Sequence, residues 1–158
     1  MGIEIERKFL VHVDRLPTLE PSAAVEMTQG YLADSPTVRV RVGTDTDGTA
    51  RGWLTIKAPG MLARAEFEYE VPAEDARSIL SLAHARISKV RYRVPHAGHT
   101  WEVDRFDGAL EGLWLAEIEL DRPDETFERP SWIDEEVTED PRYSNGALAR
   151  TQRIPSRQ

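Results

Sequence analysis

Residues 3–11 read Ile-Glu-Ile-Glu-Arg-Lys-Phe-Leu-Val, and the apolar side chains of this stretch interleave with Glu4, Glu6 and Lys8. A period of two is typical of a β-strand with one apolar and one charged face. The alternation recurs along the chain, and further runs read as strands without it. These segments are 26–32, 38–42, 52–57, 64–71, 89–94, 101–104 and 116–120. The pattern predicts about eight strands.

Turn residues separate several of these strands. Asp47-Gly48, Ala97-Gly98 and Asp107-Gly108 lie where antiparallel hairpins would close. Few helices are expected: one at 72–84, a short one near 13–16 and a terminal one at 143–150. The predicted fold is mainly β (α+β), an eight-stranded antiparallel β-barrel with a few peripheral helices.

The composition is that of an ordinary globular protein. The 158 residues include no Cys, which excludes thiol catalysis and thiolate zinc sites. No apolar run approaches the roughly 20 residues of a membrane span, and the first residues lack a signal-peptide core. We expect a single domain over residues 1–158, located in the cytoplasm, with no membrane partner.

The net charge of −8 argues against a basic surface for nucleic acid. Residues 121–140 carry nine acids and two bases, so the remainder has 19 acids against 18 bases. This acidic segment is expected to form a solvated helix and loops, with a partner-binding edge as the alternative. The body of the protein is therefore nearly neutral but densely charged.

The charges on the strands are sorted by sign. Residues i and i+2 share one face of a strand, and the like-charged sets are Arg39 with Arg41; Lys89, Arg91 and Arg93; Glu66, Glu68 and Glu70; Glu102 with Asp104; and Glu117 with Glu119. Bases facing carboxylates inside a barrel would suit a polyphosphate that carries a divalent metal ion. The alternative is an open sheet whose charged faces are solvated.

The lysines favour the first interpretation. The chain has 17 Arg and three Lys, and Lys8, Lys57 and Lys89 all fall on charged strand faces. A compact ammonium among so many guanidinium groups indicates a selected role. The residues alone leave both interpretations open.

The segment Glu4-Ile-Glu-Arg-Lys8 resembles the Glu-x-Glu-x-Lys hallmark of the CYTH superfamily, the triphosphate tunnel metalloenzymes. The resemblance continues in order through most of the chain. Its further segments are Gln29-Gly-Tyr31, Val38-Arg-Val-Arg-Val42, Leu54-Thr-Ile-Lys57, Arg64-Ala-Glu-Phe-Glu-Tyr-Glu70, Lys89-Val-Arg-Tyr92, Trp101-Glu-Val-Asp104, Leu115-Ala-Glu-Ile-Glu-Leu120, Glu136-Val-Thr138 and Tyr143-Ser-Asn145. It implies a closed eight-stranded tunnel lined with charged residues.

The resemblance also implies roles by position. The triphosphate-binding bases would be Lys8, Arg39, Arg41, Lys57, Lys89 and Arg91. The metal-binding carboxylates would come from Glu4, Glu6, Glu66, Glu68, Glu117 and Glu119, with Asp104 as a further member. Lys8, Tyr31, Glu6 and Glu119 would be the catalytic groups, although Tyr31 also fits a strand aromatic packed in a core.

Within this superfamily the start of the chain looks most like the bacterial triphosphatase branch. We expect hydrolysis of inorganic triphosphate (tripolyphosphate) to pyrophosphate and phosphate with Mg²⁺ or Mn²⁺. Two alternatives remain open. One is an enzyme for an organic triphosphate, of the thiamine triphosphatase, nucleoside triphosphatase or class IV adenylate cyclase kind; the other is a polyphosphate- or nucleotide-binding module with little turnover. The partner would be a small triphosphate-bearing molecule, and the chain a monomer or homodimer.

Overall fold

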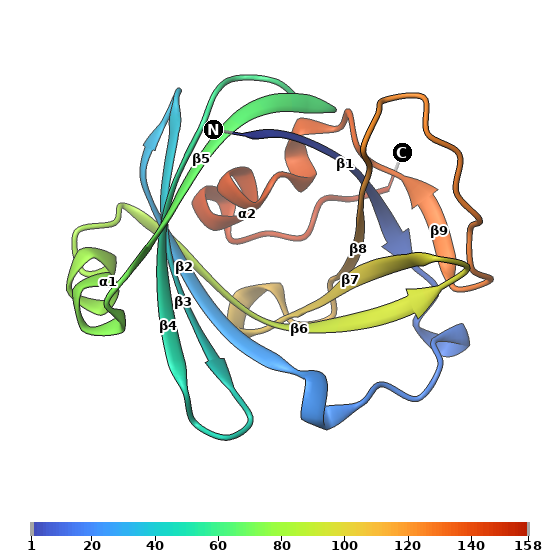
Figure 1. Cartoon of the computed structure of the whole chain (residues 1–158), viewed down its shortest axis with the longest axis horizontal. Helices are drawn as coiled ribbons and strands as arrows, with labels where there is room; N and C mark the ends of the chain where they lie inside the picture. Colours follow the sequence, from blue (N-terminus) through green and yellow to red (C-terminus); the bar gives the residue numbers. More distant parts are fainter. Residues whose placement is uncertain (1, 158) are drawn as a thin grey trace.

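The computed structural model describes residues 2–157, and its strands form one antiparallel sheet that closes on itself (Figure 1). The strands are β1 (Gly2–Val11), β2 (Val25–Asp34), β3 (Thr37–Asp45), β4 (Ala50–Lys57), β5 (Ala63–Val71), β6 (Ala85–His96), β7 (His99–Phe106), β8 (Trp114–Glu119) and β9 (Ile133–Glu136). Their order is β5-β4-β3-β2-β6-β7-β8-β1-β9, and β5 also pairs with β1. The predicted closed eight-stranded barrel is confirmed, with β9 as an additional strand.

Strand β1 closes the ring. Its residues 6–10 pair with β8, while residues 2–5 pair with β5. Phe9 and Val11 pair with β9, so β5 and β9 follow one another along the same edge of β1. The stretch that opens the chain is thus the seam of the barrel.

The apolar faces of several strands point outward and need a cover. On β1, β7 and β8 they form a cluster that includes Phe9, Trp101 and Ile118, all at most 1% exposed. The acidic segment 121–140 covers this cluster, because Phe127 and Trp132 stack edge-on against Trp101. The barrel therefore leaves its polar faces for the interior.

The prediction of a helix within residues 121–140 is wrong. Residues 121–132 form turns and loop, and Ile133–Glu136 form β9. Pro123 and Pro130 disfavour a continuous helix, and the buried Trp132 anchors the loop to the barrel wall. The segment is acidic on its exposed side, but its position is set by apolar packing.

Helix α1 (Ala73–Leu80) covers the outer face of β3 and β4 and is shorter than the predicted 72–84. Ala76 and Leu80 pack against Val40 and Val42. The fit requires a glycine: a Cβ on Gly52 would lie 2.6 Å from the Cβ of Ala76. The short helix near 13–16 is present as a 3₁₀ turn, Val13–Arg15. It contributes no buried residue.

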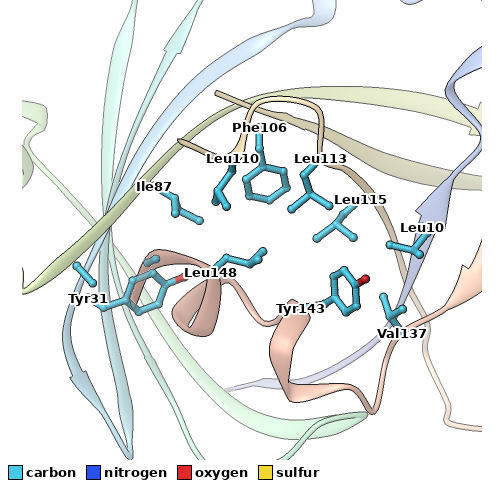
Figure 2. Packing of buried hydrophobic residues seen from close by; sticks show 12 residues of the cluster. Leu10, Tyr31, Ile87, Phe106, Leu110, Leu113, Leu115, Val137, Tyr143 and Leu148 are labelled. Atoms are coloured by element: carbon cyan, nitrogen blue, oxygen red, sulfur yellow. The ribbon is translucent and has the colours of Figure 1, made fainter. Parts of the chain in front are cut away.

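The terminal helix α2 (Asn145–Thr151) follows a 3₁₀ turn at Pro141–Tyr143, close to the predicted 143–150. It lies within the ring of strands in Figure 1, and Leu148 points into a cluster at that end of the barrel (Figure 2). Ser144 accepts a hydrogen bond from the Ala147 amide and caps the helix. Neither α1 nor α2, nor any other helix of residues 2–157, is long and apolar enough to cross a membrane.

Candidate active site

The barrel encloses a cavity of about 470 Å³ lined by charged side chains from all eight barrel strands. All six predicted phosphate-binding bases line it, as do six of the seven predicted carboxylates and Tyr31. These are Lys8, Arg39, Arg41, Lys57, Lys89 and Arg91, with Glu4, Glu6, Glu66, Glu68, Glu117 and Glu119. The structure thus brings together in one cavity predicted site residues that lie up to 115 positions apart in the sequence, from Glu4 to Glu119. The alternating faces explain this, because period two turns every second residue inward.

Asp104 is the predicted site residue that does not line the cavity. It is 1% exposed, and its carboxylate accepts two hydrogen bonds from Arg91, at 2.8 and 2.9 Å. Lys89 Nζ lies 2.7 Å from Oδ2, the oxygen that also accepts from Arg91 Nη2. Burial raises the pKa of Asp104, but Arg91 and Lys89 outweigh burial and hold it below the ordinary value. In this arrangement Asp104 holds two of the cations in place.

Lys57 forms a second group of ion pairs, at the seam where β1 meets β5. Its Nζ donates to Glu4 Oε1 at 2.7 Å and lies 3.3 Å from Glu66 Oε2. Lys57 and Glu66 are direct partners in the β4–β5 ladder, while Glu4 comes from β1. Burial raises the pKa of Glu4, and Lys57 opposes that shift. One cation therefore serves two carboxylates.

The pKa values of Glu6 and Glu117, which lie on adjacent strands, shift in opposite directions. Burial raises the pKa of Glu6 to about 8, and the charges of Glu117 and Glu4 add to that shift. Burial also disfavours the charged form of Glu117, but Lys8 and Arg91 outweigh it and hold its pKa well below the ordinary value. Glu117 is thus charged at neutral pH, while Glu6 retains its proton in the metal-free protein.

The six predicted phosphate-binding bases that line the cavity are buried or half-buried. Lys8 Nζ donates to the Tyr143 carbonyl oxygen at 3.1 Å and lies 3.7 Å from Glu117. Burial lowers the pKa of Lys89 to about 7 and that of Arg41 to about 9, and neighbouring cations add to both shifts. Within residues 2–157 the buried Arg39 Nε has no hydrogen-bond partner, although its Nη2 donates to Thr55 at 3.3 Å. A buried donor of this kind suits an anionic ligand.

The lining also includes residues that the sequence-based prediction omitted. Arg64, Arg93 and Glu102 lie on the charged strand faces already recognised in the sequence, so alternation alone could have placed them in the cavity. Met27 and Trp53 line it as well. Ser144, Asn145, Gly146 and Arg150 come from α2 and the residue before it. No periodic signal links that helix to the strands.

The carboxylates fit a hard divalent cation in their chemistry, because Mg²⁺ and Mn²⁺ prefer oxygen ligands. Among residues 2–157 no three His, Asp or Glu side chains converge into a complete metal site. Mg²⁺ is commonly held by one or two carboxylates together with substrate phosphates and waters. The donor set therefore fits an ion that is bound jointly with a phosphate chain.

The fold and this lining define a tunnel protein with a mixed cationic and carboxylate interior, and the comparisons agree. The profile of the CYTH domain matches residues 2–151. The chain therefore belongs to the CYTH domain family.

Two relatives and one solved structure are similar to this chain over almost its full length. The chain is 43% identical over 155 residues to the inorganic triphosphatase of Acetivibrio thermocellus, which covers 95% of both chains. It is 38% identical over 151 residues to the inorganic triphosphatase of Nitrosomonas europaea, covering 92% of this chain and 96% of the relative. The crystal structure of the inorganic triphosphatase NE1496 aligns with a TM-score of 0.65 at 34% identity and covers 99% of each chain.

Proposed function

We propose that this chain hydrolyses inorganic triphosphate to pyrophosphate and phosphate, and that residues 1–158 act as a single tunnel domain. The observation that carries the proposal is one cavity lined by all six predicted phosphate-binding bases and by six of the predicted carboxylates. The two relatives named as inorganic triphosphatases, which match almost the full chain, support the same reaction.

The bases would bind the phosphate chain. Lysine and arginine donors on several strands surround the cavity, so oxygens along a linear triphosphate would each meet a cation. Arg91 is fixed by Asp104, and Arg41 by Gln29, whose Oε1 accepts from its Nε at 2.9 Å. Such fixed donors stabilise the developing charge without reorganising during the reaction.

The carboxylates Glu4, Glu6, Glu66, Glu68, Glu117 and Glu119 would hold Mg²⁺ or Mn²⁺. When bound, the ion supplies Lewis-acid neutralisation of the phosphoryl oxygens. Glu6 and Glu119 are direct partners between β1 and β8, and we assign one of this pair to orient water and accept its proton. The oxygen of that water bonds to the terminal phosphorus, the bond to the bridging oxygen breaks, and pyrophosphate leaves. Lys8 and Tyr31 would donate to oxygens of the transferred group.

The test is phosphate release with Mg²⁺ or Mn²⁺ from tripolyphosphate, ATP and thiamine triphosphate. We expect wild-type protein to prefer tripolyphosphate, and Glu6→Gln and Lys57→Ala each to lose activity by at least about 100-fold. Glu128→Gln changes an exposed residue and Arg105→Ala a half-buried one; neither residue lines the cavity, so both variants should retain activity. Full activity in Glu6→Gln or Lys57→Ala would remove the assigned site. If phosphate is released faster from ATP or thiamine triphosphate than from tripolyphosphate, the organic triphosphate is the preferred substrate.

A further inference from the structure

Gln29 lies at the centre of a buried hydrogen-bond chain beside the cavity. Its side chain is 0% exposed, on the inward face of β2. Arg41 Nε donates to its Oε1 at 2.9 Å, and its Nε2 donates to Tyr31 Oη at 2.9 Å. The same Nε2 lies 3.5 Å from Asn145 Oδ1, to which Lys89 Nζ donates at 3.0 Å. The amide therefore contacts three residues of the site, Arg41, Tyr31 and Asn145.

The chemistry of these partners determines which way the amide faces. An arginine side chain has donors and no acceptor, so the atom of Gln29 that faces Arg41 must be the oxygen. The NH₂ group must then face Tyr31 and Asn145. The lysine ammonium likewise has no acceptor, so the Asn145 atom shared by Lys89 and Gln29 is its oxygen. The two assignments agree with each other.

This orientation decides what the Tyr31 hydroxyl can do. A hydroxyl has one proton, and Oη already accepts from Gln29, so its proton is directed away from the amide. Tyr31 lines the cavity. Its hydroxyl is thereby prepared to donate to an oxygen of a bound anion.

We propose that Gln29 is a positioning residue that makes Tyr31 a hydrogen-bond donor to the reacting phosphate. The inference rests on the proposed triphosphatase reaction, since it is the phosphate chain that would accept this proton. Gln29 itself does not touch the substrate in this role. Because its amide oxygen accepts from Arg41, its NH₂ group must donate to the Tyr31 hydroxyl oxygen.

The informative variant is Gln29→Glu, which is nearly isosteric. A carboxylate would still accept from Arg41, but it would also accept from Tyr31, so the hydroxyl proton would turn back toward residue 29. We expect kcat for tripolyphosphate to fall at least about tenfold. The added negative charge should also raise KM. Gln29→Met, which is neutral and forms neither bond, should lower kcat by a similar factor.

A Tyr31→Phe background separates the two effects. If Gln29 acts through the hydroxyl, Gln29→Glu should raise KM in this background but leave kcat within about twofold of Tyr31→Phe alone. An undiminished fall in kcat in the Tyr31→Phe background would overturn the proposal. So would wild-type kcat in both single variants. Gln29→Met serves as the second test if Gln29→Glu does not fold, as judged by circular dichroism.

A measurement without substrate keeps this proposal distinct from the proposed function. With ¹³Cζ-labelled tyrosine, the Tyr31 resonance is assigned by its loss in Tyr31→Phe. It should shift downfield in Gln29→Glu, because the hydroxyl then donates to a carboxylate. An unchanged resonance would overturn the assigned direction of the hydrogen bond, whatever the substrate proves to be. A shift combined with no phosphate release by wild-type protein would instead count against the triphosphatase function alone.

Discussion

At the residue scale, the carboxylates of β1 and β8 show how position in the wall decides protonation. Glu117 is surrounded by cations and stays charged, whereas burial and neighbouring acids raise the pKa of Glu6 to about 8. Between the ordinary pKa of 4.5 and 8, folded protein retains a proton on Glu6 that the unfolded chain has lost. The free energy of unfolding therefore falls as pH rises through this window.

Glu6→Gln removes this dependence in metal-free protein. Relative to wild type, the variant should gain stability as pH rises from 5 to 9, by a few degrees in Tm. Thermal melts in the presence of a chelator measure the difference at each pH. Glu128→Gln, which changes an exposed carboxylate, is the matched control and should show no such trend. A constant difference between Glu6→Gln and wild type would contradict the raised pKa.

Asp104→Asn tests the buried ion cluster. The change leaves Lys89 and Arg91 without their shared carboxylate, and removing one member of a buried pair typically costs about 3–5 kcal/mol. Urea denaturation gives the free energy of unfolding. Asp107→Asn, in an exposed pair 3.7 Å from Arg105, should change it by less than about 1 kcal/mol. Equal effects of the two variants would mean that Asp104 does not organise the cluster.

At the element scale, the strands and both helices were predictable, but strand β9 and the places where the helices pack on the barrel were not. Period two locates an inward face on each strand, which explains why the lining of bases and glutamates follows from the sequence. Asp104 was placed on that inward face correctly, but its register opposite Arg91 turns it into a partner of the cations. Strand β9 and helix α2 are positioned by contacts distant in sequence, such as that of Asn145 with Lys89, which no local period encodes.

The packing of α1 on β4 makes a further prediction at this scale. Gly52→Ala would place a Cβ 2.6 Å from that of Ala76 and 3.1 Å from the Val71 carbonyl oxygen, so it should destabilise the fold by about 1–3 kcal/mol. Adding Ala76→Gly should restore part of the loss, making the double variant less destabilised than the sum of the singles. Gly2→Ala, whose Cβ would meet open space, is the control. Denaturant melts of wild type, the two single variants and the double variant measure the free energies of unfolding. Strict additivity of the two substitutions would exclude a direct clash between residues 52 and 76.

At the scale of the whole molecule, net charge is a poor guide to what the interior binds. The value of −8 argues against a basic outer surface, and it arises mainly from residues 121–140, whose Phe127, Trp132 and Ile133 pack on the outer apolar cluster of the barrel. The tunnel itself holds bases and carboxylates in equal number among the predicted residues. Closure of the sheet separates the two surfaces, and composition alone cannot reveal that separation.

The ion pairs of the tunnel have one further consequence. Lys57 is the counter-ion of Glu4 and Glu66, and Lys8 of Glu117. A phosphate chain that takes these lysines leaves the carboxylates uncompensated, and a divalent ion alone does the same to the lysines. Each ligand should therefore strengthen the binding of the other, by a factor that is the same in both directions.

Thermal shifts can reveal this reciprocity. Tripolyphosphate with a chelator, or Mn²⁺ without tripolyphosphate, should each raise Tm slightly, whereas both together should raise it by more than the sum of the two shifts. Complex formation between the two in solution would only reduce the combined shift. Additive shifts would mean that the two ligands bind independently. A combined shift larger than the sum would instead mean that the tunnel takes up the phosphate chain and its divalent cation together, as one salt, rather than at two separate sites.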